Sequence, residues 1–446
     1  MAMQATENKT SKENVQKIKI LKAAEKLLAF HGYPCFTIRN IAERTGVSVG
    51  SVQHYYRTKN ELLQDLLLYV TDKYNEEYGR VFSRTFDSPD DRFFGFVDFL
   101  LQDMTNPLRR GFFFQAWALA PMDEYVEKRM EESFSRYHTA VSNMVKDLNP
   151  ELSKTEISKR ASAIQSIIEG TQLTLVKKGR YFVHRESIRS TVREEAYAIA
   201  TGVTAKSDIL TYGQAVLPVK TRKKIKLPNG LSSGTAILPK GKHRSGQILQ
   251  KAQDVLVQEG YPNFTMRNIA AKAGIRMGNL QYYYQTKNDL LRAMFQHAIE
   301  AHSGRFMKLD SLPGIEPQNL FTKVIDYLLA DLKKLHVRGL FLQIWALSMH
   351  DNYAEHCLEE IYEHYRNALS GIITRINPDL SMHECNDRAA AIQALIEGSQ
   401  MSLTLIDGRL VQKRGLNKVI KERAYLIAAR PGRFVGSSKS QGGVTA

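Results

Sequence analysis

The sequence of 446 residues repeats itself at one constant offset. The segment GYPCFTIRNIA, which begins at Gly32, returns as GYPNFTMRNIA from Gly260, 228 residues further on. The same offset aligns AIQSIIEG (163–170) with AIQALIEG (391–398) and several separate blocks between them. A register kept over so many blocks indicates a duplication, so the chain must fold as two copies of one unit. They are called copy one and copy two below.

The boundaries of the copies follow from the repeat and from a change in composition. Between the copies lies a stretch rich in Gly, Pro, Ser, Thr and Lys, which is typical of a linker. Each copy divides into a short N-terminal segment and a longer remainder. We therefore expect DNA-binding segments at 15–64 and 245–292, helical regulatory domains at 65–202 and 293–430, a linker at 203–244 and a tail at 431–446.

Almost every segment within a copy has the period of an α-helix. In the first segment Ile20, Ala24 and Leu27 share one helical face, and Ile248, Ala252 and Val255 repeat it. Asn149-Pro150 and Asn377-Pro378 interrupt the pattern between long helices. Alternating strand patterns with hairpin turns are missing from the sequence. The predicted fold class is all-α, with two tandem units.

Two short helices are predicted inside each DNA-binding segment. In copy one, Thr37 is a good N-cap for a helix over 38–44, and Gly46 suits its left-handed C-cap. Ser48 can cap a second helix over 49–56. Apolar residues would pack the pair at a steep angle and leave the outer face of the second helix free. That arrangement is a helix-turn-helix, whose second helix enters the major groove of DNA.

These blocks resemble the TetR family of tetracycline-repressor-like regulators. The resemblance rests on GYxxFTxRNIAxxxG and on VSVGSVQHYYRTKNELL (47–63) and IRMGNLQYYYQTKNDLL (275–291). It covers both copies, and its DNA-binding part is highly specific. It implies a transcriptional regulator, a repressor in most of the family, that binds double-stranded DNA.

The resemblance also assigns roles to single residues. Arg39 and Arg267 would reach a guanine edge or a phosphate. Gly50 and Gly278 would let the helix backbone approach the DNA closely. Phosphate contacts would fall to Thr37, Tyr55, Lys59, Thr265, Tyr283 and Lys287. Base-edge reading would fall to Ser48, Val49, Ser51, Gln53 and His54 in copy one and to Arg276, Met277, Asn279, Gln281 and Tyr282 in copy two. Tyr56 and Tyr284 fit core packing better than DNA contact.

The two sets of base-reading residues are not equivalent. Ser48 becomes Arg276 and Ser51 becomes Asn279, and arginine favours guanine whereas asparagine favours adenine. We therefore expect an operator with two related but unequal half-sites.

A single helix-turn-helix reads few base pairs, so such regulators usually bind as two-fold dimers. The resemblance implies pairing through the last two long helices of each unit, here about 154–178 with 187–200 and 382–406 with 416–429. An apolar stripe at Ala161, Ile164 and Ile168, repeated at Ala389, Ile392 and Ile396, fits an intradomain core as well as an interface. The prediction is an intramolecular pseudo-dimer, and a higher oligomer stays open.

The linker is strongly basic. From 201 to 245 there are nine Lys or Arg against one acid, in a chain of net charge +16. A cluster at Arg222, Lys223, Lys224 and Lys226 fits a solvated spacer, or a tether that contacts the DNA backbone or minor groove.

The regulatory domains are the expected place for an effector. Aromatic runs at 93–99 and 112–117 fit a helical core or a small-molecule pocket. Gln115, Trp117, Gln343 and Trp345 are the candidate pocket residues, and the two glutamines fit ligand-orienting groups or satisfied core amides. We expect an apolar or amphipathic effector, if there is one.

Other classes of protein are disfavoured. Nucleophile elbows, phosphate-binding loops and HExxH helices are missing, so an enzyme, a cofactor and a metal are not expected. Three scattered cysteines, no apolar N-terminal leader and no long apolar run favour a cytoplasmic, nucleoid-associated protein without membrane spans. A protein-interaction module that has lost specific DNA binding remains the alternative function.

Overall fold

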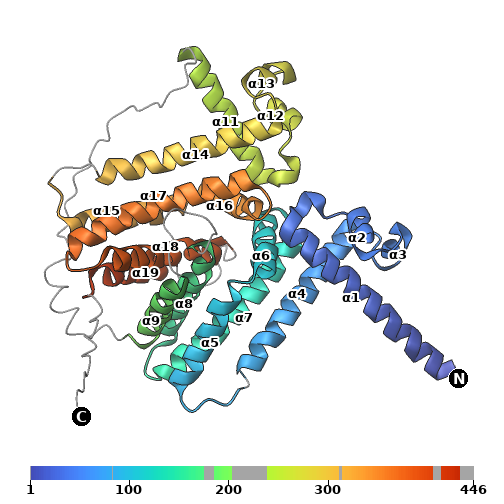
Figure 1. Cartoon of the computed structure of the whole chain (residues 1–446), viewed down its shortest axis with the longest axis horizontal. Helices are drawn as coiled ribbons and strands as arrows, with labels where there is room; N and C mark the ends of the chain where they lie inside the picture. Colours follow the sequence, from blue (N-terminus) through green and yellow to red (C-terminus); the bar gives the residue numbers. More distant parts are fainter. Residues whose placement is uncertain are drawn as a thin grey trace, which may run out of the picture.

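The computed structural model describes residues 2–82, 84–174, 185–202, 239–310, 314–404 and 413–431, and within these ranges it contains helices and no strands. The predicted all-α class with two tandem units is confirmed (Figure 1). The helices of copy one are α1 (Ala2–Cys35), α2 (Ile38–Thr45), α3 (Val49–Tyr55), α4 (Lys59–Phe82), α5 (Pro89–Asp103), α6 (Pro107–Leu119), the 3-10 turn η1 (Ala120–Met122), α7 (Glu124–Leu148), α8 (Lys154–Thr174) and α9 (Arg185–Thr201).

Copy two repeats this order after the linker. Its helices are α11 (Pro239–Asn263), α12 (Met266–Lys272), α13 (Met277–Tyr283), α14 (Lys287–Asp310), α15 (Pro317–Asp331), α16 (Leu335–Ser348), α17 (Asn352–Ile376), α18 (Met382–Thr404) and α19 (Lys413–Ala429). The first helix of each copy begins earlier than predicted. Residues 2–14 include few apolar side chains, so the sequence has no apolar periodicity there that would predict a helix. The last residues of the expected linker belong to α11, which Pro239 opens at a position where proline loses no hydrogen bond.

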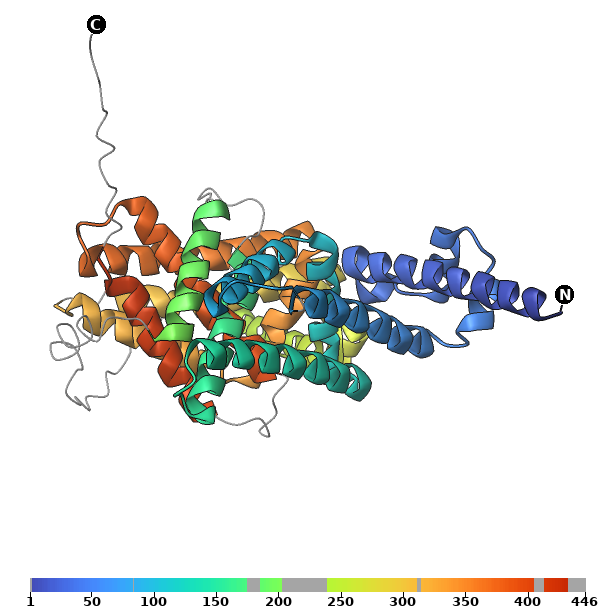
Figure 2. The same ribbon diagram turned by 90° about the horizontal axis from the view of Figure 1, so that it is seen from below.

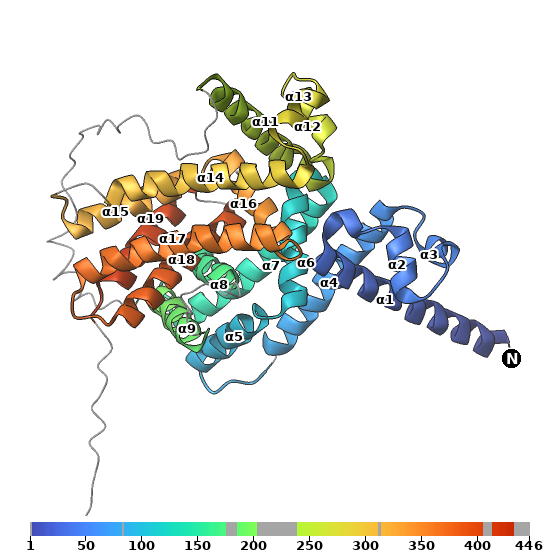
Figure 3. The same cartoon turned by 45° about the horizontal axis from the view of Figure 1, so that its top comes forward.

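The two copies pack against each other through α8, α9, α18 and α19, here called the pairing bundle (Figure 3). Helices α8 and α18 cross most closely at Gly170 and Gly398, which are equivalent positions. A Cβ on Gly170 would overlap the carbonyl oxygen of Ala394, and a Cβ on Gly398 would overlap that of Ser166. The apolar stripes of α8 and α18 are fully buried at this crossing. The predicted pairing through the last two long helices is confirmed.

A second contact between the copies lies where α6 meets α16. Gln115 Nε2 donates to the carbonyl oxygen of Ala346 at 2.8 Å, and Gln343 Nε2 donates to that of Ala118 at 2.9 Å. The two bonds are equivalent by the 228-residue offset, so the copies are related by a pseudo-two-fold axis. The amides of Gln115 and Gln343 are therefore satisfied across the interface between copies, where both side chains also line a small pocket, and their role as ligand-orienting groups stays a prediction.

Two glycines hold the start of each copy close to the other copy. Gly32 has φ of 74° and Gly260 has φ of 77°, both in the left-handed region that favours glycine. A Cβ on Gly32 would overlap the ring of His350, and one on Gly260 would overlap the side chain of Met122. Seen from below, copy one's DNA-binding segment and the start of α1 project from one end, with the pairing bundle toward the other (Figure 2).

Candidate nucleic-acid interface

The helix-turn-helix of copy one forms as its caps predict. Thr37 accepts a hydrogen bond from the Asn40 amide at 3.2 Å, and Gly46 ends α2 at φ 68°. Ser48 accepts from the Ser51 amide at 3.1 Å and so begins α3. Ile41 and Val52 are fully buried between the helices. The pair α2–α3 is thereby fixed at a steep angle, with one side of α3 against the core.

Copy two builds the same motif with one different cap. Thr265 accepts from the Asn268 amide at 3.2 Å, and Gly274 has φ of 64°. Arg276 occupies the position of Ser48 but makes no capping bond, because an arginine side chain has no acceptor. Its side chain is exposed and free to extend from the start of α13.

The predicted base-reading residues lie together on the outer side of α3 and of α13, here called the reading faces. Tyr282 is 86% exposed, and Val49 and Met277 are exposed although they are large and apolar. Exposed apolar side chains on a short helix do not stabilise the fold of the chain itself. The exposed set in copy one is Ser48, Val49, Gly50, Ser51, Gln53 and His54, and in copy two it is Arg276, Met277, Gly278, Asn279, Gln281 and Tyr282.

Gly50 and Gly278 have no structural reason to be glycine. Both lie inside helices, where glycine costs about 1 kcal/mol relative to alanine. A Cβ on Gly278 would meet nothing within 4 Å, and one on Gly50 would meet only Ser48 Oγ at 3.8 Å. The absent side chains therefore leave the helix backbone open to a partner outside the chain.

The remaining predicted contact residues surround the reading faces. Arg39, Arg267 and Thr265 are exposed, whereas Thr37, Tyr55 and Tyr283 are half-buried. Tyr56 and Tyr284 are buried, as the core interpretation predicts, and Tyr56 donates to Asp65 at 2.6 Å. The linker cluster Arg222, Lys223, Lys224 and Lys226 lies outside the described residues.

The Lys59 and Lys287 side chains are less accessible than those of lysines that contact only a DNA phosphate. Lys59 Nζ donates to the Tyr33 carbonyl oxygen at 3.1 Å and lies 3.4 Å from the centre of the Tyr33 ring. Burial lowers the pKa of Lys59 to about 8 and lowers that of Lys287. Lys287 lies 3.8 Å above the equivalent Tyr261 ring. Each lysine thus joins α4 or α14 to the end of the preceding first helix, and its phosphate contact stays a prediction.

A cavity lies within copy one between α4, α6, α7 and α8. It encloses about 590 Å³ of empty volume, including its opening to solvent. Trp117 lines it as predicted, and five further rings surround it: Tyr74, Tyr78, Phe113, Phe134 and Tyr137. Gln343 and Trp345 lie outside this cavity. Its three charged residues, Arg109, Arg110 and Glu169, were not predicted from the sequence, although a charge inside an apolar helical run indicates an unusual site.

The charged residues of this cavity differ in whether they form ion pairs. Arg109 is buried over the Tyr74 ring and forms ion pairs with Glu77, at 2.7 Å, and with Asp103. Glu169 accepts from Gln172 Nε2 at 2.9 Å, and burial raises its pKa to about 7. The hydroxyl of Tyr137 is buried without a hydrogen-bond partner among the described residues. The cavity lining therefore carries two arginines and one acid among aromatic rings, and two further acids beside the cavity are paired with Arg109.

Copy two differs from copy one in the equivalent region. Trp345 Nε1 donates to the Tyr362 hydroxyl at 2.7 Å, and both side chains are buried. In copy one, Phe134 stands at the position of Tyr362 and offers Trp117 no acceptor. Val337 and Ile361 replace Arg109 and Ser133. The copies thus differ in their regulatory domains as well as in their reading faces.

Metal-binding clusters and membrane-spanning helices are both absent from the described part of the chain. No group of three or more His, Cys, Asp or Glu residues there is arranged to hold a metal ion. Among the described helices, none is both long and apolar enough to cross a membrane.

Comparisons with known proteins agree with this geometry. The sequence profile "Bacterial regulatory proteins, tetR family" matches residues 20–66 and again 248–294. The HTH-type transcriptional regulator BetI of Escherichia coli O17:K52:H18 is 24% identical over 175 residues, which are 39% of this chain and 88% of BetI. BetI of Proteus mirabilis is 26% identical over 159 residues, 35% of this chain and 77% of its own. A TetR transcription regulator from Haloarcula marismortui shares 24% identity with a TM-score of 0.37, covering 42% of this chain and 98% of its own.

Both profile matches coincide with the helix-turn-helix segments that carry the reading faces. The chain therefore carries two tandem DNA-binding domains of the TetR family of transcriptional regulators, one at the start of each copy.

Proposed function

We propose that this regulator binds one double-stranded operator as a single-chain pseudo-dimer and represses transcription there. The observation that carries the proposal is the pair of exposed, unlike reading faces on two copies that are packed about a pseudo-two-fold axis. A linker of about 40 residues has a root-mean-square span of roughly 35 Å, enough to join the copies. Such a tether gives an effective concentration near millimolar, so operator binding would not require a second chain.

The alternative is a protein-interaction module that keeps the scaffold without specific DNA binding. Gly50 and Gly278 argue against it, since a lost DNA surface would have no use for glycine inside these helices. A mobility shift with genomic fragments separates the two functions. Specific retardation that survives competitor DNA supports the regulator, and its absence at every salt concentration supports the module.

Selection of bound sites from random DNA should return an operator with two unequal half-sites. The difference should map to copy two's Arg276 and Asn279, because each correct bidentate contact is worth about 1–3 kcal/mol. A variant with Ser48→Arg, Val49→Met, Ser51→Asn and His54→Tyr gives copy one the reading face of copy two. Its selected operator should become symmetric.

Glu194→Gln, an exposed change far from both reading faces, serves as the control for this selection and should leave the operator unchanged. Equal half-sites for the unaltered chain would contradict the proposal. So would a stoichiometry of two chains for each operator.

The effector is proposed to be a small amphipathic cation that binds the cavity of copy one. Aromatic faces attract cations electrostatically, most strongly in sites shielded from water. Arg109 is paired with Glu77 and Asp103 and acts on the Glu169 carboxyl only from a distance, so Glu169 forms no ion pair among the described residues. A bound cation would supply one.

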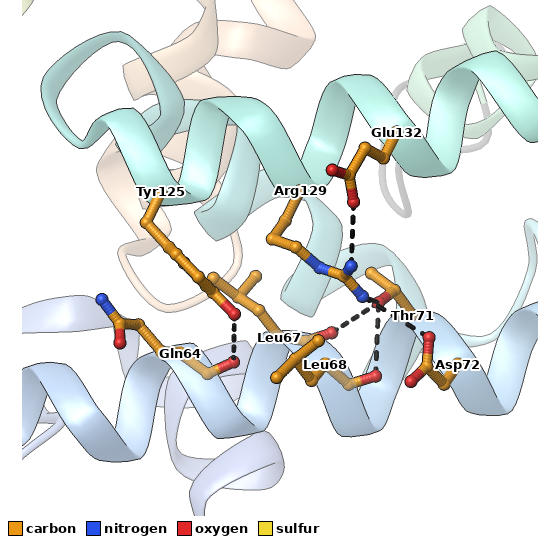
Figure 4. Close-up of polar contacts among 8 residues, drawn as sticks. All are labelled: Gln64, Leu67, Leu68, Thr71, Asp72, Tyr125, Arg129 and Glu132. Carbon is orange, nitrogen blue, oxygen red and sulfur yellow. Dashed lines mark hydrogen bonds and ion pairs between the residues drawn. The ribbon is translucent and has the colours of Figure 1, made fainter.

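An effector in the cavity would act on the DNA-binding segment through α4. Two of the cavity's walls are α4, which follows the helix-turn-helix directly, and α7. Arg129 of α7 joins these two helices (Figure 4): its guanidinium donates to Thr71 at 3.0 Å and to Asp72 at 3.4 Å, and it pairs with Glu132. An effector that separates α4 from α7 beside Arg129 would reorient α3 relative to α13.

Choline and its uncharged isostere 3,3-dimethylbutan-1-ol test the proposed chemistry, because they differ by one atom. The cation should bind about tenfold or more tightly than the alcohol. Its affinity should rise from pH 6 to pH 8, since Glu169 ionises as the pH passes about 7. Glu169→Gln should remove both effects in a calorimetric titration, whereas Glu397→Gln, the equivalent change in copy two, should leave them.

Equal binding of the two compounds, or no binding of either, would contradict a cationic effector. Neither result would bear on operator binding.

A further inference from the structure

The 228-residue offset makes the interface between the copies an internal comparison. The pseudo-two-fold axis gives every position at the interface an equivalent position in the other copy. Where the residues are the same, the contacts repeat, as for Gln115 and Gln343. Where the residues differ, the difference shows what each copy requires of its partner.

The pairing bundle differs most at one buried position. Glu195 on α9 and Arg423 on α19 are equivalent by the offset, and they are 3% and 9% exposed. Glu195 forms an ion pair with Arg430 of the other copy. Arg423 Nη2 donates to the carbonyl oxygen of Ala198 on α9 at 2.9 Å. The residue equivalent to Arg430 in copy one is Gly202, so copy one supplies the acid here and copy two supplies both bases.

The two copies also carry different side chains at a second pair of equivalent positions. The Ser187 hydroxyl of copy one donates to Asp387 of copy two. The equivalent contact brings Gly415 of copy two against Lys159 of copy one, where a Cβ would overlap the lysine side chain. On one side of the axis the Ser187 hydroxyl thus faces the Asp387 carboxylate, and on the other side Gly415 leaves room for the long Lys159 side chain.

We propose that the pairing surfaces of the two copies are complementary to each other and incompatible with themselves, so that copy one accepts only copy two as its partner. The proposal concerns the choice of partner and does not depend on DNA binding. It follows from what like pairs would bring together. A pair of two copies one would place Glu195 beside a second Glu195 and would lack the Arg423 and Arg430 guanidiniums. Arg160 would remain at the position equivalent to Arg388, and Lys159 would face a serine where it now meets a glycine.

A pair of two copies two would bring Arg423 and Arg430 together twice without the Glu195 carboxyl, with Glu384 at the position equivalent to Glu156, and would leave Asp387 without the Ser187 hydroxyl. Buried like charges at an interface suppress wrong partners, because their desolvation is not offset by attraction. Burial raises the pKa of Glu195 and lowers that of Arg423, and each shift is opposed by the other residue's charge. The complementary pair thus stabilises the ionised form of both groups.

The test begins with the full chain, folded and then cut at a protease site inserted between residues 203 and 238. Unlabelled and ¹⁵N-labelled preparations are cut, mixed, exchanged in mild urea and returned to buffer for native mass spectrometry. Complexes of copy one with copy two in mixed labels report that exchange took place. We expect like pairs to stay below about 1% of complexes, as a cost of several kcal/mol implies. Like pairs in the statistical 1:2:1 proportion would overturn the proposal.

A charge-exchange cycle tests the same idea by reversing single charges before the chain is cut. In an Arg430→Gln background, Glu195→Arg or Arg423→Glu alone should weaken the association of the cut fragments by about 100-fold, because each leaves like charges together. Both changes together should restore most of that loss. The matched control is Glu194→Gln, which removes an exposed acid one residue away. Single exchanges as mild as the control, or a double exchange no better than the singles, would refute the assignment.

Discussion

Alanine at Gly170 and Gly398 together should separate the two copies and abolish operator binding. Each new Cβ would overlap a backbone carbonyl of the opposite helix, which cannot rotate away as a side chain can. Overpacking of a core costs about 1–3 kcal/mol for each site, and here both sites act on one crossing. The loss should therefore exceed about 3 kcal/mol.

The direction of this effect is informative because alanine favours helices. Within an α-helix, glycine to alanine alone should stabilise by about 1 kcal/mol. Gly371 on α17 is the matched control, since it is helical and exposed and a Cβ there would meet nothing within 4 Å. Thermal melting and small-angle scattering should show a less stable, more extended chain for the double variant and no loss for Gly371→Ala. A double variant as stable and as compact as the unaltered chain would disprove the crossing.

The stability of the chain should fall as the pH rises from 5 to 9 because of Glu169 and its equivalent Glu397. Burial raises their pKa values to about 7 and about 8, above those of unfolded carboxyls. A raised pKa means that the folded state holds the proton longer than the unfolded state. The stabilisation is therefore complete below about pH 4.5 and is lost as the pH passes through 7 and then 8. Each group contributes on the order of 3 kcal/mol.

A variant with Glu169→Gln and Glu397→Gln isolates this effect, because glutamine resembles the protonated acid and does not titrate. The melting temperatures of the variant and the unaltered chain should agree near pH 5 and diverge in the variant's favour toward pH 9. Glu194→Gln, which removes an exposed acid, should follow the unaltered chain throughout. Parallel melting curves for all three proteins would show that neither buried carboxyl titrates in this range.

The sequence predicts local structure well wherever a residue acts on its own neighbours. Thr37, Ser48 and Gly46 determine where the short helices begin and end, and each does so within a few residues of itself. The apolar periods predict which faces are buried for the same reason. The duplication adds long-range information, because it reports that two units exist and that both keep the same motif.

Contacts between distant segments are the part that the sequence does not predict. The amide of Gln115 finds its acceptor 231 residues away, and the pattern around it fits a ligand contact equally well. The glycines that end AIQSIIEG and AIQALIEG could have indicated a close contact, because glycine inside a helix needs a compensating close approach. Apolar periodicity does not take glycine into account. Arg109 and Glu169 are similar, because a charge in an apolar run identifies an unusual site but not its partner.

The hydrogen bond between Trp345 and Tyr362, which copy one lacks, has a consequence for how the regulator would report its effector. A symmetric dimer with two equal pockets can respond cooperatively, with a Hill coefficient above one. A chain that binds the proposed effector in copy one alone would have one such pocket for each pair of reading faces. Its dose–response curve would then be hyperbolic, spread over nearly two decades of effector concentration. Such a regulator would grade expression with effector level, not switch it at a threshold.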